Sequence, residues 1–160
     1  MKNDIKIDID TQSLKLINKD NGLEKIFKIS SSRYGVGQKN GSFCPPLGKH
    51  LIRAKIGNHA AINSVFVKRR FTGEIFSGDM VKKFPDRDWI LTRIMWLSGC
   101  EIGFNRLGDV DTMRRYIYIH GAPDTVKMGF PGSIGCIRMR NCEIVELFKL
   151  VDVGTQVTIV

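Results

Sequence analysis

Alternating apolar and polar positions predict that the chain begins with β-strands. Isoleucines alternate with charged residues over residues 5 to 10, which is the two-residue period of a strand with one buried face. A second strand begins at Leu14, and Asn21-Gly22 can adopt the left-handed conformations of a tight hairpin. Residues 23 to 29 then form the returning strand, so the pattern predicts an opening β-meander.

Further apolar runs and turn residues divide the rest of the chain. Residues 30 to 50 are rich in Ser, Gly and Pro and predict a long loop. We therefore expect a mainly β fold with one or two short helices, in a single domain over residues 1–160. The other expected elements are strands over residues 51–56, 61–71, 89–97 and 114–120, a short helical turn near 79–84, a helix from Asn141 as N-cap to about Leu150, and a last strand through Val157 and Ile159.

The predicted strand over residues 114–120 has two different faces. Arg114, Tyr116, Tyr118 and His120 share one face, and two isoleucines occupy the other. The isoleucine face is expected to join the core. The polar and aromatic face is typical of the floor of a binding cleft, and a plain solvent-exposed face is the alternative.

Charge and composition limit the class of protein. The net charge of +9 implies an anionic partner or environment, such as nucleic acid, acidic lipid or a carboxylate-rich polymer. No RNA-binding signature is present, which argues against nucleic acid. The four cysteines lack zinc-site spacing and are too few for a disulfide framework, so we expect neither a structural zinc site nor a set of disulfides. We also expect a monomer.

The location of the protein is open at this point. No apolar run is long enough for a transmembrane helix, and the first residues form a charged strand rather than the apolar core of a signal peptide. The sequence as written therefore predicts a cytosolic protein.

Cys136 is the strongest candidate for a reactive residue. A thiol attacks a carbonyl as thiolate, so it needs a base, and His120 ends the predicted strand one glycine-rich loop earlier. Gly135 allows a sharp turn that can direct the N–H groups of Gly135 and Cys136 at one oxyanion. Spacing alone leaves a small buried structural cysteine as an equal alternative.

The full pattern around Cys136 is more specific. It resembles the catalytic signature of the L,D-transpeptidase family, the YkuD type. The resemblance covers nearly the whole chain, including the opening hairpin, a proline-glycine loop and the helix after Asn141. It implies a β-sandwich or curled mixed sheet. The residues that match the signature are His120-Gly121, then Ser133, Gly135-Cys136-Ile137 and Arg138, with Pro46-Leu47-Gly48 and Asp111-Thr112 matching elsewhere.

The resemblance implies a specific activity on peptidoglycan, with a part in cell-wall organisation and cell shape. Cys136 would attack the amide before the terminal D-alanine of a stem tetrapeptide, and His120 would be the base. An amine from a second stem or a lipoprotein would resolve the thioester. Ser133, Gly135, Arg138, Tyr118 and Gly121 would support the site or contact substrate. The resemblance implies no metal and no cofactor. This activity implies the periplasm or cell envelope, with the cytoplasm as the alternative.

The chain departs from the family pattern at two positions. Ile134 stands where many members have histidine, so His120 is the only imidazole expected near Cys136. Pro45 stands where threonine is common, which puts in doubt how its loop lies over the substrate.

Two other functions remain possible from the sequence. With water as acceptor, the same chemistry makes an L,D-carboxypeptidase, a hydrolase that trims tetrapeptide stems. A non-enzymatic module could instead bind an anionic polymer through arginines 69, 70, 114 and 115.

The remaining cysteines and histidines are expected to be structural or exposed. Cys44 is predicted to be a partly exposed free thiol, and Cys100 and Cys142 to pack in the interior. His50 and His59 are predicted to lie on the surface.

Overall fold

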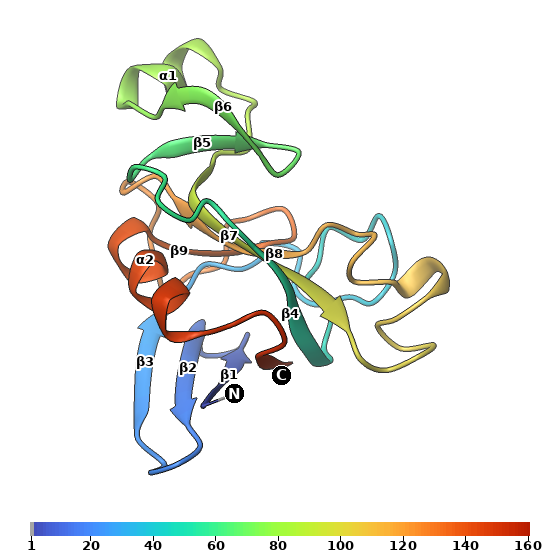
Figure 1. Cartoon of the computed structure of the whole chain (residues 1–160). Coiled ribbons are helices and arrows are strands. Elements are labelled where there is room, and N and C mark those ends of the chain that lie inside the picture. The colour runs from blue at the N-terminus through green and yellow to red at the C-terminus, as the bar shows by residue number, and fades with distance from the viewer. Residues whose placement is uncertain (1) are drawn as a thin grey trace.

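The opening meander forms as predicted. In the computed structural model, which describes residues 2–160, β1 (Asn3–Asp8), β2 (Ser13–Asn18) and β3 (Glu24–Lys28) pair in antiparallel order. Gly22 has a φ of +70° in the turn between β2 and β3, a conformation that glycine adopts without steric cost. The meander lies at one end of the molecule (Figure 1).

All ten strands join one mixed, curled sheet, which confirms the predicted fold class. The main path runs β3-β2-β1-β10-β4-β7-β5-β6, and β8 joins β7 to β9. Two pairs are parallel, β1 with β10 and β8 with β9. The remaining elements are β4 (Gly48–Ile56), β5 (Ser64–Val67), β6 (Arg70–Ile75), α1 (Gly78–Lys83), β7 (Ile90–Gly99), the short 3-10 helix η1 (Gly108–Val110), β8 (Tyr118–Ala122), β9 (Ile137–Arg140), α2 (Asn141–Leu150) and β10 (Gln156–Ile159).

The main core lies between the curled sheet and α2. Alternate residues of the strands supply it, including Ile119 of β8 and Ile137 of β9, which are both fully buried. Helix α2 buries Ile144 and Leu147 and packs against β7, β8 and β9 (Figure 1). The core therefore fixes β8 and β9 from one face and leaves their other face to line a cleft.

Two of the predicted strands were wrong in detail. The single strand expected over residues 61–71 is the hairpin β5–β6, which turns at Lys68 and Arg69, both with positive φ. A turn without glycine gives little sequence signal. The strand expected from residue 114 begins only at Tyr118, because residues 112–116 form turns that end with Tyr116 at a φ of 55°. Arg114 therefore does not lie on the strand.

The N-cap of the helix that follows Cys136 lies one residue earlier than expected. Arg140 is the N-cap of α2, and Asn141 is its first residue. The Asn141 side chain is buried because it bonds the end of β8 and neighbouring loops. The short helix α1 and the last strand β10 form where the sequence predicted them. Within residues 2–160 no helix has the length and apolar character needed to span a bilayer.

The prediction that His50 lies on the surface was wrong. The imidazole of His50 is buried, and its two nitrogens lie 3.0 Å from the Gly48 carbonyl oxygen and 3.0 Å from the Thr112 hydroxyl. Burial lowers the pKa of His50 to about 4, and the hydrogen bond with Gly48 opposes that shift only in part. His59 is exposed, as expected.

We expect the free energy of unfolding to fall as the pH falls from 6.5 to about 4. Between these pH values His50 becomes protonated in the unfolded chain but stays neutral in the native protein. Lowering the pH therefore favours unfolding by up to about 3 kcal/mol. Urea titrations at several pH values will measure the effect. His50→Gln should flatten the pH dependence, and His59→Gln, a matched exposed control, should leave it unchanged. Equal slopes in both variants would contradict a neutral buried His50.

Candidate active site

The parallel pair β8–β9 carries His120 and Arg138 and positions the segment that contains Cys136. His120 pairs with Arg138 in register, and Ile119 pairs with Ile137. Because side chains alternate along a strand, the two isoleucines enter the core while His120 and Arg138 project from the opposite face. Cys136 lies one residue before β9 on that same face, diagonal to His120. The structure therefore brings together the two residues that sequence analysis singled out.

The orientation of the His120 ring is fixed by its own backbone. Nδ1 lies 2.7 Å from the Gly121 carbonyl oxygen, which can only accept a hydrogen bond, so Nδ1 holds the hydrogen. In the neutral ring this leaves Nε2 with its lone pair. The ring is almost fully buried, and burial lowers the pKa of His120 although the charge of Asp88 opposes the shift. His120 is therefore neutral near pH 7 and able to accept a proton at Nε2.

A tight turn over residues 133–136 positions the thiol. The Ser133 hydroxyl donates to the Cys136 carbonyl oxygen at 2.6 Å and accepts from the Gly135 N–H at 3.3 Å. Gly135 has a φ of +140°, which a side chain would strain. Ser133 is itself held by backbone bonds to Ser31 at 2.9 Å and Arg33 at 3.0 Å. Ser133 and Gly135 thus shape the turn that carries Cys136, and their roles toward a substrate stay a prediction.

The Cys136 thiol is bonded to the strand beside it. Its Sγ accepts from the Tyr118 N–H at 3.3 Å and donates to the Tyr116 carbonyl oxygen at 3.4 Å. Burial raises the pKa of Cys136 to about 12, against the lowering effect of the Tyr118 N–H and the Arg115 charge. The thiol is therefore protonated at neutral pH in this structure.

The Tyr118 N–H is a donor that sequence reasoning missed. We had expected an oxyanion to be bound by the N–H groups of Gly135 and Cys136. The Gly135 N–H donates to Ser133, whereas the Tyr118 N–H points at Sγ. No residue type marks such a backbone donor, because its direction depends on where two strands meet.

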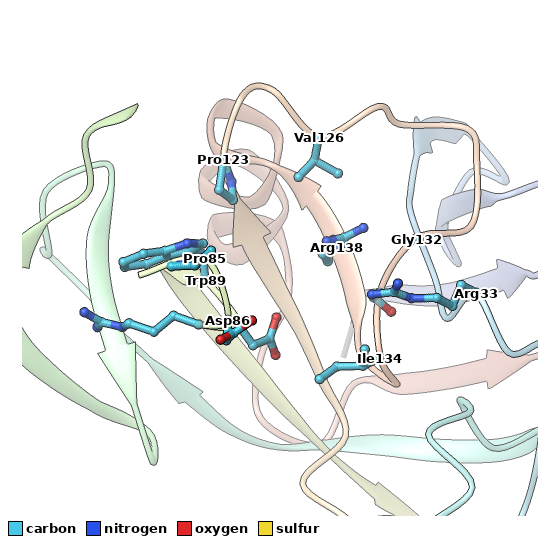
Figure 2. A pocket seen from close by; sticks show the side chains of 12 residues that line it. Arg33, Pro85, Asp86, Trp89, Pro123, Val126, Gly132, Ile134 and Arg138 are labelled. Atoms are coloured by element: carbon cyan, nitrogen blue, oxygen red, sulfur yellow. The ribbon is translucent and has the colours of Figure 1, made fainter. Parts of the chain in front are cut away.

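The thiol faces a cleft of about 330 Å³. Phe43 and Cys44 of the long loop form one wall, and Tyr116 lies on another. A second cavity, shown in Figure 2, has a volume of about 350 Å³ and shares Asp88 and Ile134 with the first.

One arginine holds the loop that forms the cleft wall. The Arg115 guanidinium donates to the Gly37 and Gln38 carbonyl oxygens and to the Ser42 hydroxyl, each at 3.1 Å, and also to the Cys44 carbonyl oxygen. These contacts join the turn before β8 to a loop more than seventy residues earlier in the chain. The sequence had suggested Arg115 only as part of a charged surface.

A buried asparagine fixes the end of β8. The Asn141 amide nitrogen donates to the Ala122 carbonyl oxygen and to Asn63 Oδ1, both at 3.0 Å, and Asn141 Oδ1 accepts from the Thr92 hydroxyl. Thr92 has a φ of 74° at a bulge where β7 pairs with β8. The side-chain amide therefore replaces the regular strand bonds that the bulge removes.

The family of the chain follows from its sequence profile. Residues 2–159 match the L,D-transpeptidase catalytic domain, YkuD. The chain belongs to this family.

Similarity to individual L,D-transpeptidases is strong in fold and low in sequence. The L,D-transpeptidase of Mycobacterium smegmatis aligns over 99% of the chain with a TM-score of 0.60 and 18% identity. L,D-transpeptidase 3 of Mycobacterium tuberculosis aligns over 99% with a TM-score of 0.61 and 14% identity. The latter was also solved with a faropenem-derived adduct, at 15% identity and a TM-score of 0.61.

The curated match is short. A Fuscovulum blasticum protein, provisionally named an L,D-transpeptidase from an ATP synthase subunits region, is 50% identical over 42 residues. That alignment covers 26% of this chain and 22% of the relative. The chain spans 58% and 61% of the two mycobacterial structures, so it is similar to a part of each.

Several other expected site residues have structural contacts in this L,D-transpeptidase domain. Tyr118 is buried, and its hydroxyl accepts from Arg69 at 2.8 Å. Arg138 donates to the Ser30 hydroxyl at 3.1 Å and is one of the residues that line the second cavity.

The predictions for the other three cysteines were wrong. Cys44 is buried, whereas Cys100 and Cys142 are exposed, the reverse of what we expected for all three. Among residues 2–160 no cluster of three or more His, Cys, Asp and Glu has metal-binding geometry.

Gly121 has no room for a side chain. A Cβ there would lie 2.5 Å from the Leu91 carbonyl oxygen and 2.6 Å from Asn141 Oδ1. We expect Gly121→Ala to lower the free energy of unfolding by about 1–3 kcal/mol, because β8 must move away from β7. Gly78→Ala is the matched control, since a Cβ there contacts nothing, and it should be neutral or slightly stabilising. Chemical denaturation checks both, and equal stabilities would contradict the close packing at Gly121.

Proposed function

We propose that this domain is a peptidoglycan L,D-transpeptidase in which Cys136 is the nucleophile and His120 the general base. The observation that supports this most is the fixed tautomer of His120 beside Cys136 in the β8–β9 register. A base needs a free lone pair next to the nucleophile, and the Gly121 carbonyl reserves Nε2 for that purpose. Peptidoglycan is a polymer of the cell envelope, so we propose that compartment for the activity, which cell fractionation can test.

The first half of the proposed reaction forms a thioester. As Sγ attacks the amide carbon before the terminal D-alanine, the thiol proton moves to His120 Nε2. The carbonyl oxygen becomes an oxyanion, for which we propose two donors. These are the Cys136 N–H and the Tyr118 N–H, which exchanges its bond to Sγ for one to the oxygen. When the C–N bond breaks, His120 returns its proton to the leaving nitrogen, and D-alanine departs.

The second half regenerates the thiol. An acceptor amine attacks the thioester carbon and loses a proton to His120, the C–S bond breaks, and Sγ takes that proton back. An amine from a second stem gives a 3→3 crosslink, and a lipoprotein amine gives an anchored protein.

The raised pKa of Cys136 affects the timing of proton transfer in the proposed reaction. With a pKa of about 12, little thiolate exists at pH 7, so proton transfer to His120 accompanies attack rather than preceding it.

We expect faropenem to acylate Cys136. Intact mass spectrometry should show one adduct on the wild-type protein and none on Cys136→Ala. His120→Gln should slow acylation by about 100-fold or more, because it removes the base. Cys142→Ala removes an exposed thiol that does not line the cleft and should react like wild type. An adduct on the Cys136→Ala protein, or none on wild type, would contradict the proposal.

Product analysis separates transfer from hydrolysis. With disaccharide-tetrapeptide as the substrate we expect crosslinked dimers and free D-alanine. Monomeric tripeptide alone would instead assign the carboxypeptidase activity to the same thioester. Cys136→Ala should give neither product, with its circular dichroism spectrum unchanged.

The polymer-binding alternative has less support. Arg69 donates to Tyr118 and stacks over Trp96 at 4.9 Å, and Arg115 holds the long loop. These two arginines have internal partners, so the charged surface that the sequence suggested is reduced to Arg70 and Arg114.

A further inference from the structure

The second cavity has opposite charges on facing sides. Figure 2 shows Arg33 and Arg138 on one side and Asp86, beside Trp89, on the other. Asp88 also lines this cavity, and it belongs to the Cys136 cleft as well. Besides Arg87, which also lines the cavity, two guanidinium groups and two carboxylates therefore border a space of about 350 Å³.

These four charges have no ion-pair partners in the described part of the chain. The ion pairs found in residues 2–160 involve other residues throughout. Arg87 lies between the two aspartates in sequence but binds Glu74 through two bonds of 2.9 and 3.2 Å, and its guanidinium stacks over Trp89 at 4.3 Å. Arg87 is thus already neutralised, and the aspartates are left to face the cavity.

The basic side is built into the backbone of the site. Arg138 is half-buried, its Nη2 donates to the Ser30 hydroxyl, and its Nε is buried with no hydrogen-bond partner among residues 2–160. The Arg33 N–H donates to the Ser133 carbonyl oxygen at 3.0 Å, which places Arg33 beside the same turn. Two guanidinium groups on one side of a cavity that form no ion pair favour a planar anion that can accept several N–H bonds.

The electrostatics link this cavity to His120 and Cys136. Burial lowers the pKa of Arg138, while the charge of Asp88 raises it and that of Arg33 lowers it further. Asp88 raises the pKa of both His120 and Cys136, and Arg138 lowers that of His120. Both sides of the cavity therefore adjoin the pair, with Arg138 next to His120 in register.

We propose that the second cavity binds the zwitterionic end of an amino acid, with its carboxylate at Arg33 and Arg138 and its ammonium at Asp86 and Asp88. Pro85, Trp89 and Val126 add apolar surface for an aliphatic chain leading to that end. The inference rests on the proposed function, because a diaminopimelate residue in a stem has such an end on such a chain.

Direct binding tests the recognition without the reaction. Diaminopimelate capped at one end is titrated into the Cys136→Ala protein and followed by NMR. It should bind saturably, and acetylating the free amine or amidating the free carboxylate should raise the Kd by about ten-fold each, as expected for losing one charge-assisted contact. Capped forms that bind as well as the parent would overturn the proposal.

Charge-matched variants assign the two sides of the cavity. Asp88→Asn and Arg33→Gln should each raise the Kd by about ten-fold. Asp79→Asn and Lys82→Gln remove the same charges from α1, outside the residues that line the cavity, and should retain the affinity. If the cavity variants bind like these controls, the zwitterion site is wrong.

The acylation and binding experiments test the nucleophile and the zwitterion site separately. Faropenem acylation of Cys136 without diaminopimelate binding would overturn the zwitterion site and retain the nucleophile. Binding without acylation would overturn the role of Cys136 and retain the site.

The zwitterion could belong to either stem, and Arg33→Gln distinguishes them. If it belongs to the donor, single-turnover release of D-alanine from tetrapeptide slows by about ten-fold. If it belongs to the acceptor, release is unchanged and the products shift from dimer towards tripeptide. A variant unchanged in both measurements would overturn the proposal.

Discussion

The parallel pairing of β8 with β9 determines how His120, Arg138 and Cys136 lie relative to one another. Its register aligns His120 with Arg138 and leaves Cys136 diagonal to the imidazole. The same alternation that buries Ile119 and Ile137 in the main core directs these polar side chains to the opposite face of the strand pair. A slip of one residue would exchange the two sets, so the stability of the core and the geometry of the site depend on the same register.

Side-chain contacts around this strand pair hold β8 in place where its pairing with β7 is irregular. The bulge at Thr92 interrupts pairing between β7 and β8, and the Asn141 amide takes up the groups that it leaves. Gly121 allows the strands to approach closely there. Because Asn141 begins α2, the helix that covers the core also holds the strand that presents His120.

Local patterns predicted much of this fold, and long-range contacts account for what they missed. The meander, α1, α2 and β10 have clear periodicity or turn residues, and Cys136 and His120 lie in a distinctive motif. The β5–β6 turn is closed by Lys68 and Arg69, residue types that seldom mark a turn. His50 is buried because Thr112 and Gly48 happen to flank it, which no spacing in the sequence indicates. The charges of the second cavity come from three separate segments, so they meet only in the fold.

The attachment of the long loop by Arg115 has a consequence for how this domain can diversify. Three of its acceptors, in Gly37, Gln38 and Cys44, are backbone carbonyl oxygens, which every residue type provides. Replacements along the loop can therefore alter the side chains presented to the cleft without detaching the loop from its anchor. Arg115 itself has no such freedom, because no other side chain offers a planar fork of five donors. The loop that forms the cleft wall can thus accept substitutions at the residues that would contact a ligand. Arg115, which anchors this loop, cannot be replaced in the same way.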